Sequence, residues 1–271
     1  MYEIKKKLQN GELTLGTIIS EVRNPNIAYM LAQCGFEFFI IDNEHGTYTF
    51  ETISNIIAAA KGAGISVIVR VPEISRECIL KPLDSGASGL LVPMVSTAEA
   101  AKKVIEHAKY PPMGNRGAGI RRPHNRYAKV NAAEYIQQAN KDTFIAVQAE
   151  TRQSLENIDE IASVEGVDCI FVGPFDLSIS LGIPGQVDHP LEVAAIKKIV
   201  SACRKHNKIA GILMFDQKLL SKWINEDFRF AVYSSDITLL ADAAAKAVTE
   251  LKNLKEKTVG GFSTDKVDML V

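Results

Sequence analysis

Two carboxylates follow neighbouring apolar runs in this chain of 271 residues. Glu150 ends the run that begins at Thr143, and Asp176 comes just after the run Cys169–Pro174. If the runs are adjacent parallel strands, the carboxylates converge, and two like charges held close are costly unless a cation or proton lies between them. Oxygen ligands without a cysteine or histidine cluster favour a hard divalent ion. The alternative is that each acid simply occupies the first turn of a helix.

Gln148 and Arg70 support a binding site at the same place. Gln148 precedes Glu150 by two residues, so strand alternation directs both side chains to one face, where a buried Gln–Glu pair is hard to explain as packing. Arg70 ends the run SVIVR, and a guanidinium is costly to bury without an anionic partner. Its planar fork suits a carboxylate or phosphate. The alternative is a structural salt bridge to Glu150 or Asp42.

A further group of candidates follows the run Phe36–Asp42, in the string IDNEHG. Histidine is the side chain most easily tuned for proton transfer near neutral pH, and a nearby carboxylate would orient the ring of His45. Polar residues occupy equivalent positions after two of the runs: Asp42 and Glu44 here, and Ser234, Ser235 and Asp236 after the last one. We assign the other histidines to structure or surface, keeping His124 open because of its loop: His107, His124, His189 and His206.

Other kinds of catalysis lack their residues. No apolar run ends in the lysine that a Schiff-base aldolase needs, and no GxSxG nucleophile elbow is present. The glycine-rich string GPFDLSISLGIPG lacks the Lys–Ser/Thr pair of a phosphate loop, although the N–H groups of Phe175 and Asp176 could bind an anion. These absences favour metal-assisted chemistry over covalent chemistry.

The elements that must position these side chains alternate along the chain. Eight short apolar runs are typical of strands buried on both faces: 15–20, 36–42, 66–71, 89–93, 143–150, 169–174, 209–214 and 228–234. Stretches with helical spacing lie between them: 50–61, 97–108, 154–162, 191–206 and 237–251. This alternation predicts an α/β fold, a single (β/α)₈ TIM barrel. An open doubly wound sheet is the alternative, but the first strand lacks a GxGxxG turn.

The chain is expected to form one domain. We predict that residues 1–255 form the barrel and that residues 256–271 form a C-terminal tail, flexible or in contact with another subunit. The segment Lys109–Val130 is predicted to be a long basic loop, punctuated by proline and glycine, after the fourth strand. Loops of this length in a compact domain are commonly functional or disordered.

Composition excludes several classes of protein. The 46% hydrophobic and 23% charged residues are typical of a soluble globular chain, and a net charge of −1 argues against a nucleic-acid partner. No apolar run approaches the roughly 20 residues needed to cross a membrane. There is no secretory signal, and the four widely spaced cysteines form no CxxC pair. We therefore predict free thiols and a cytoplasmic location.

In order and spacing, several strings resemble the HpcH/HpaI family of metal-dependent class II pyruvate aldolases: IDNEHG, VIVR, LLVPMV, YPPMGNRG, VQAET and FVGPFDLSISLG. The resemblance extends from about Gly11 to Leu251. It implies a (β/α)₈ barrel, usually assembled as a hexamer of two trimers that exchange the last helix between neighbours. We therefore expect a homo-oligomer, either a trimer or a hexamer.

The resemblance also assigns roles to residues. It implies that Glu150 and Asp176 hold a divalent cation such as Mg²⁺, Mn²⁺ or Co²⁺, and that Arg70 and Gln148 contact a pyruvyl group. It implies that the carboxylate of this group is received by the backbone at Gly173, Phe175 and Asp176. His45, supported by Asp42 and by Asp84 of the string KPLDSG, looks like the acid–base group.

The implied reaction is reversible cleavage of 4-hydroxy-2-oxoacids into pyruvate and an aldehyde. An acyl-CoA lyase of the citrate-lyase β-subunit type remains an alternative, although YPPMGNRG and IDNEHG favour the aldolase. A non-catalytic barrel that binds a keto acid is a further alternative. The chain departs from the family pattern at Phe175, where alanine is more usual, at Asn43, and in the string VYSSD that ends the eighth strand.

Overall fold

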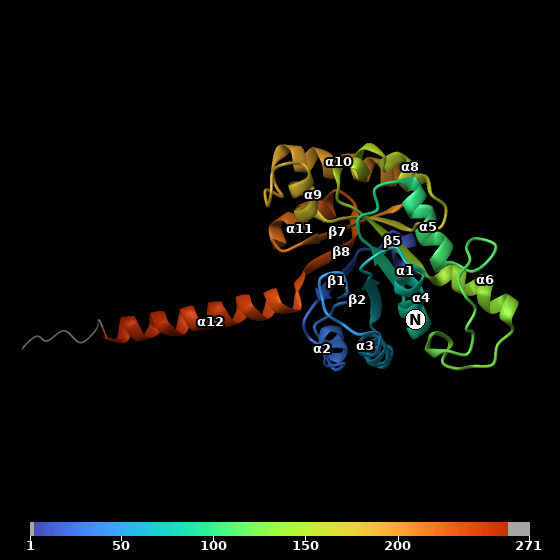
Figure 1. Ribbon diagram of the computed structural model, residues 1–271. Helices are drawn as coiled ribbons and strands as arrows, with labels where there is room; N and C mark the ends of the chain where they lie inside the picture. The colour runs from blue at the N-terminus through green and yellow to red at the C-terminus, as the bar shows by residue number, and fades with distance from the viewer. Residues whose placement is uncertain (1–2, 260–271) are drawn as a thin grey trace, which may run out of the picture.

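The chain folds into a closed barrel of eight parallel strands (Figure 1). The structure, a computed structural model, describes residues 3–259. The strands follow one another around the barrel in sequence order, and β1 pairs with β8 to close it, which confirms the predicted barrel and excludes an open sheet. Their bounds are β1 (Thr14–Ile19), β2 (Phe38–Asp42), β3 (Ser66–Arg70), β4 (Gly89–Val92), β5 (Phe144–Ala149), β6 (Cys169–Val172), β7 (Ile209–Met214) and β8 (Phe228–Ser235).

Helices connect the strands, and most of them pack around the outside of the barrel (Figure 1). They are α1 (Glu3–Gln9), α2 (Ile27–Gln33), α3 (Phe50–Ala63), α4 (Arg76–Ser85), α5 (Ala98–Ala108), α6 (Ala132–Asp142), α7 (Arg152–Glu156), α8 (Ile158–Ser163), α9 (Pro174–Ser180), α10 (Pro190–Lys205), α11 (Gln217–Asn225) and α12 (Asp236–Val259). Within the described range 3–259, none of these helices is long and apolar enough to span a membrane.

One predicted helix is divided in two. The stretch 154–162 was expected to be continuous, but Asn157 ends α7 and begins α8. Its side-chain Nδ2 donates to the carbonyl oxygen of Ser96 at 2.9 Å. This bond ties the junction between α7 and α8 to the loop that precedes α5.

The barrel interior shows why the strands carry unbroken apolar runs. Phe38 and Phe230 stack inside the barrel with ring centroids 4.4 Å apart, and Phe171 packs edge-on against Phe230 at 5.7 Å. A Cβ on Gly16 would lie 2.5 Å from the ring of Phe38, so glycine makes room for the aromatic layer. A second, larger core fills the space between the barrel and the helices. Both faces of most strands are therefore buried, as is typical of parallel strands, although Leu15 in β1 is exposed.

The segment Lys109–Val130 is a loop, as predicted, with a single 3₁₀ turn at Pro123–Asn125 (η1), and the unpredicted helix α6 follows it. The loop is tied to α4 by an ion pair between Arg116 Nη2 and Asp84 Oδ1 at 2.8 Å. His124, which was left open as a candidate, bonds to the hydroxyl of Tyr135 and to a loop carbonyl. It therefore contributes to the packing of the loop.

The last helix, α12, extends away from the barrel (Figure 1). The predicted boundary at residue 255 falls inside this helix, which continues to Val259. The remainder of the predicted tail, residues 260–271, lies outside the described residues. Large apolar side chains on α12 are exposed, among them Leu240 and Leu251 at 66% each. The helix therefore presents apolar surface that its own barrel does not cover.

Candidate active site

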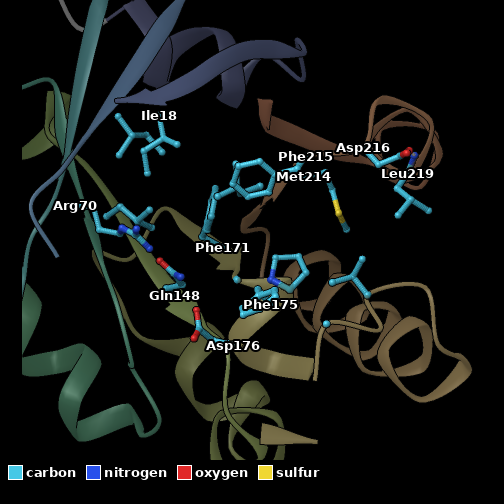
Figure 2. Close-up of a pocket in the computed structure, with 17 residues that line it drawn as sticks. Ile18, Arg70, Gln148, Phe171, Phe175, Asp176, Met214, Phe215, Asp216 and Leu219 are labelled. Atoms are coloured by element: carbon cyan, nitrogen blue, oxygen red, sulfur yellow. Dashed lines mark hydrogen bonds between the residues drawn. The ribbon is translucent and has the colours of Figure 1, made fainter. Parts of the chain in front are cut away.

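Most of the predicted site residues lie at the carboxyl ends of the strands. Asp42 and Arg70 end the paired strands β2 and β3, and Glu150 directly follows β5. A cavity of about 270 Å³ opens at this end of the barrel, and Figure 2 shows the side chains around it. Five predicted substrate-binding residues line it: Arg70, Gln148, Gly173, Phe175 and Asp176.

Arg70 is held by two carboxylates. Its Nε and Nη2 donate to the two oxygens of Asp42 at 2.9 and 2.7 Å, and its Nη1 lies 3.0 Å from Oε2 of Glu44. Burial opposes the charge on Arg70, but these two acids outweigh it and raise the pKa of the guanidinium. The salt bridge to Asp42, which was the alternative interpretation, is therefore present. Arg70 nevertheless lines the cavity, so the pair fixes a cation at its wall.

Glu150 is buried, yet both of its carboxylate oxygens accept hydrogen bonds. The backbone N–H of Met94 donates to Oε1 at 2.7 Å, and Nε2 of Gln148 donates to Oε2. Burial raises the pKa of Glu150 to about 7, and the carboxylates of Asp176 and Glu44 contribute to the increase. Met94 has a positive φ of 56°, which is uncommon for a residue other than glycine. The residue whose backbone N–H donates to Glu150 therefore has an uncommon backbone conformation.

Gly173 provides the space that the Gln148 and Glu150 side chains occupy. A Cβ at this position would lie 2.3 Å from Oε2 of Glu150 and 2.5 Å from Nε2 of Gln148. Any other residue would therefore displace them. The Oε1 atom of Gln148 is buried and has no hydrogen-bond partner among the residues that the structure describes. A buried acceptor without a partner costs free energy, so a ligand with a donor would relieve it.

The carboxylates suit a hard divalent cation. Four carboxyl groups interact electrostatically with one another or with Arg70: those of Asp42, Glu44, Glu150 and Asp176. Because Arg70 carries a single positive charge, these groups leave an excess of negative charge. Across residues 3–259 there is no group of three or more His, Cys, Asp or Glu that could hold a metal ion. Two protein carboxylates leave most coordination positions to water and substrate, as Mg²⁺ sites often do. The donor set therefore fits the ion that the resemblance implies.

His45 lies on the loop after β2, outside the cavity lining, with 67% of its side chain exposed. Its Nε2 is 3.8 Å from Oε2 of Glu44. Among the described residues no hydrogen bond joins the Asp42 carboxylate to the His45 ring, so the expected orientation of the ring by Asp42 stays a prediction. Instead, Asp42 Oδ1 accepts from the backbone N–H of His45 at 3.3 Å, and the carboxylate is occupied by Arg70. Asp42 therefore positions the loop and the arginine.

The structure does not bring Asp84 to His45. Asp84 lies on α4 and pairs with Arg116, and within the described part of the chain it makes no hydrogen bond or ion pair with His45. The expected contact between Asp84 and His45 is therefore not formed within a single chain. The role of Asp84 stays a prediction.

Some functional groups were not assigned a role from the sequence. Glu44 was noticed as a polar residue after the second strand, and its position could have suggested the contact with Arg70. Met94 acts through its backbone N–H, which no side-chain pattern reveals. Of the candidates after β8, Asp236 shapes the loop after β1, because its carboxylate accepts from the backbone N–H groups of Ser20, Glu21 and Val22.

A parallel barrel that gathers acids and a fixed arginine at the carboxyl ends of its strands has its polar residues where the active sites of barrel enzymes lie. The chain belongs to the HpcH/HpaI aldolase/citrate lyase family, whose model matches residues 19–243. It is 34% identical over 233 residues to a 5-keto-4-deoxy-D-glucarate aldolase of Shigella boydii, covering 86% of this chain and 90% of the relative. It is also 34% identical over 251 residues to a 2-keto-3-deoxy-L-rhamnonate aldolase of Klebsiella pneumoniae, covering 92% of each.

Solved structures agree with this membership. The crystal structure of an HpcH/HpaI aldolase from Desulfitobacterium hafniense superposes with a TM-score of 0.89 at 36% identity, covering 92% of this chain and 96% of that one. The relatives named here are aldolases, which are carbon–carbon lyases. The family resemblance inferred from the sequence motifs is therefore confirmed.

Proposed function

We propose that this chain is a divalent-metal-dependent aldolase that reversibly cleaves 4-hydroxy-2-oxoacids into pyruvate and an aldehyde. The convergence of Arg70, Gln148, Glu150 and Asp176 at the carboxyl end of the barrel carries the proposal. The excess of carboxylate charge there supports a cationic cofactor. Membership of a family with aldolase relatives supports the type of reaction.

Arg70 and Gln148 are assigned to the pyruvyl end of the substrate. Arg70 has five N–H donors, and those not used by Asp42 and Glu44 can bind an anionic oxygen. Its fixed charge stabilises the negative charge that develops when the carbon–carbon bond breaks and an enolate forms. The N–H groups of Phe175 and Asp176 lie in the first turn of α9, where no intrahelical acceptor exists. We assign them to the substrate carboxylate, together with the backbone at Gly173.

Glu150 and Asp176 are the residues that would hold the cation, which we expect to be Mg²⁺, Mn²⁺ or Co²⁺. The bound ion would supply Lewis-acid stabilisation to the 2-keto oxygen. A nearby cation favours the charged form of a carboxyl group. Burial and the acidic neighbours raise the pKa of Glu150. A bound cation would oppose this increase and favour the charged form of the Glu150 carboxyl group.

His45 is assigned to proton transfer. Cleavage removes the proton from the 4-hydroxyl group, and the pyruvate enolate then takes up a proton at C3. His45 is exposed on the loop next to Arg70, where an incoming substrate can reach it, and the Glu44 carboxylate at 3.8 Å provides a counter-charge for a protonated ring. Histidine is the side chain that enzymes use most often for general acid–base catalysis.

We also propose that the protein is a homo-oligomer, a trimer or a hexamer, in which α12 packs on a neighbouring copy. Leu240, Val248 and Leu251 on this helix are 66, 50 and 66% exposed, and burying such apolar surface is favourable. Light scattering after size exclusion tests this, and a monomer at micromolar concentration would contradict it. The free state of all four cysteines supports a cytoplasmic location as part of the proposal.

Metal removal tests the proposed reaction. EDTA should abolish cleavage of a generic 4-hydroxy-2-oxoacid, and Mg²⁺, Mn²⁺ or Co²⁺ should restore it. Borohydride added with pyruvate should leave the enzyme active, because no imine forms. Full activity in EDTA, or inactivation by borohydride, would contradict the proposal. Turnover of malyl-CoA or citryl-CoA in place of the oxoacid would instead indicate an acyl-CoA lyase, and no turnover of either would indicate a keto-acid-binding barrel.

A further inference from the structure

The loop between β2 and α3, residues 43–49, carries His45 and is held from two sides. At its start, Oδ1 of Asp42 accepts from the backbone N–H groups of Glu44 and His45 at 3.0 and 3.3 Å. The end of the loop packs instead against residues 20–23, which follow β1. We call these two segments the His45 loop and the β1 loop. Asp42 accounts for the first support, whereas the second comes from a segment that has no assigned role in the reaction.

The two loops are in direct backbone contact. A Cβ on Gly46 would lie 3.0 Å from the carbonyl oxygen of Ser20, an approach that the absence of a side chain makes possible. The hydroxyl of Tyr48 donates to the carbonyl oxygen of Val22 at 3.2 Å. Tyr48 is 6% exposed, and burial raises the pKa of its hydroxyl, so the phenol remains protonated as the donor. The end of the His45 loop therefore takes its position from the β1 loop.

Arg23 makes a third contact between the two loops. Its Nη2 donates to the hydroxyl of Thr47. Its guanidinium also lies over the ring of Tyr48, 5.7 Å from the ring centroid, where a cation is attracted to the aromatic face. The three residues directly after His45 thus all contact the β1 loop, so a shift of the β1 loop would move His45 with it.

A single carboxylate holds the β1 loop in place. Asp236 follows β8, the strand that pairs with β1, and is 9% exposed. Its Oδ1 accepts from the backbone N–H of Ser20 at 3.1 Å. Its Oδ2 accepts from the N–H groups of Glu21 and Val22 at 3.1 and 2.8 Å. Hydrogen bonds to an ionised carboxylate are roughly twice as strong as neutral ones, so Asp236 fixes three consecutive residues of the loop.

We infer that Asp236 is a positioning residue for proton transfer, because through the β1 loop it determines where the ring of His45 lies. The inference rests on the proposed aldolase function, in which His45 moves the proton. Asp236 does not line the cavity, and among the described residues it makes no hydrogen bond or ion pair with Arg70 or Glu150. Its loss should therefore slow proton transfer and leave the binding of metal and pyruvate unchanged.

Asp236→Asn tests this role in the full-length protein with Mn²⁺. The amide keeps the shape of the side chain but places an NH₂ donor where backbone N–H groups need an acceptor. Misplacement of a reacting group by about 1 Å can cost on the order of 10²-fold in rate. We expect this loss both in retro-aldol cleavage and in the exchange of pyruvate C3 protons. The Kd values of Mn²⁺ and of pyruvate, measured by isothermal titration calorimetry, should not change.

Asp168→Asn is the matched control. The Asp168 carboxylate also accepts from a backbone N–H, that of Ile145 at 2.9 Å, but it lies before β6 at the amino end of the barrel and pairs there with Lys5. This variant loses a carboxylate that holds the backbone, yet it should cleave and exchange at the wild-type rates.

A double-mutant cycle with His45→Ala separates positioning from a general loss of structure. Without the imidazole there is no ring to misplace, so adding Asp236→Asn should slow the residual rates by less than about twofold. Equal slowing in both backgrounds would show that Asp236 acts independently of His45 and would overturn the inference. Tyr48→Phe, which removes the donor to Val22, serves if Asp236→Asn does not fold. It should slow both rates and lose this effect in the His45→Ala background.

The outcomes distinguish this inference from the proposed function. Wild-type rates in Asp236→Asn together with slow cleavage in His45→Ala overturn the positioning role and leave the aldolase intact. Weaker binding of Mn²⁺ or pyruvate in Asp236→Asn would place the effect in the binding site and overturn the inference as well. Wild-type rates in both variants would show that His45 is not the acid–base group, and the inference would fall with that assignment. Absence of cleavage and exchange in the unmodified protein overturns the aldolase and the inference together.

Discussion

Buried charges at the amino ends of the strands are satisfied by the protein itself. Lys109 is only 1% exposed, and its ammonium donates to the carbonyl oxygens of Thr143 and Asn140 at 2.6 and 2.8 Å. Lys5 pairs with Asp168 at 2.9 Å in the same region. Burial, reinforced by the charge of Lys5, lowers the pKa of Lys109 to about 7. Each of these ammonium groups nevertheless has a fixed partner within the protein.

Buried charges at the carboxyl ends are arranged in the opposite way. Burial raises the pKa of Glu150 and of Glu44, and the carboxylate of Asp176 adds to the increase in both. Oε1 of Gln148 has no partner among the described residues. Arg70 is the cation that faces them, and Asp42 already occupies it. The two ends show how one barrel separates stability from function, because polar groups are left for a ligand at the end where active sites of such barrels lie.

The largest effect is expected at the carboxyl end from loss of the acid–base group. His45→Ala should slow both C3 proton exchange and retro-aldol cleavage by a similar factor, on the order of 10²–10⁴, because both pass through the same enolate. Rates by NMR exchange and a coupled pyruvate assay check this, and metal affinity should change little.

A histidine elsewhere in the molecule provides the control for His45. His206, at the end of α10, is paired with Asp159 at 2.9 Å, and His206→Ala should leave both rates unchanged. If His45→Ala exchanges C3 protons at the wild-type rate but cleaves slowly, His45 serves the aldehyde side alone. Survival of both rates would show that another group is the base.

Substitution of Arg70 tests whether this arginine, which is paired with Asp42 at the cavity wall, also binds substrate. Arg70→Ala should reduce kcat/KM for cleavage on the order of 10²–10³-fold, the cost of removing a fixed electrostatic partner. It should also weaken binding of pyruvate. Arg70→Lys should restore activity only in part, because an ammonium cannot reproduce the bidentate fork to Asp42. Wild-type kinetics in the lysine variant would show that the arginine is structural.

The sequence predicted the barrel and most of this site because both depend on regular patterns. Arg70 and Asp176 were found by looking just after apolar runs, and the topology of a parallel barrel brings those positions together. The sequence could not show that Asp42 is occupied by Arg70, since that depends on which of several nearby acids reaches the guanidinium. Nor could it show the N–H of Met94, because a backbone donor depends on φ and ψ and not on residue type. Helix α6 was missed beside a loop rich in proline and glycine.

At the amino end, the comparison predicts a loss of stability without a loss of activity. Lys109→Met removes the donor to two buried carbonyls, and each unsatisfied group costs about 1–3 kcal/mol. The melting temperature should therefore fall by several degrees, while kcat/KM of the folded enzyme stays unchanged. Lys141→Met is the control, because this neighbouring lysine is exposed. A fall in kcat/KM with unchanged stability would show that the two ends are coupled.

Glu192 provides the smallest and most specific test of the contrast between the two ends. It lies in the first turn of α10, and both of its carboxylate oxygens are buried without a partner among the described residues. Burial raises its pKa from 4.5 to about 7. The folded state therefore binds more protons than the unfolded state between these values, and the stability that Glu192 contributes is lost as the pH rises through about 7.

Glu192→Gln should match the wild type near pH 4.5 and melt about 2–4 °C higher at pH 8, corresponding to ~1 kcal/mol. Thermal unfolding across this range measures the difference, with the exposed Glu165→Gln as control. A constant difference at every pH would show that the Glu192 carboxyl does not titrate in this window.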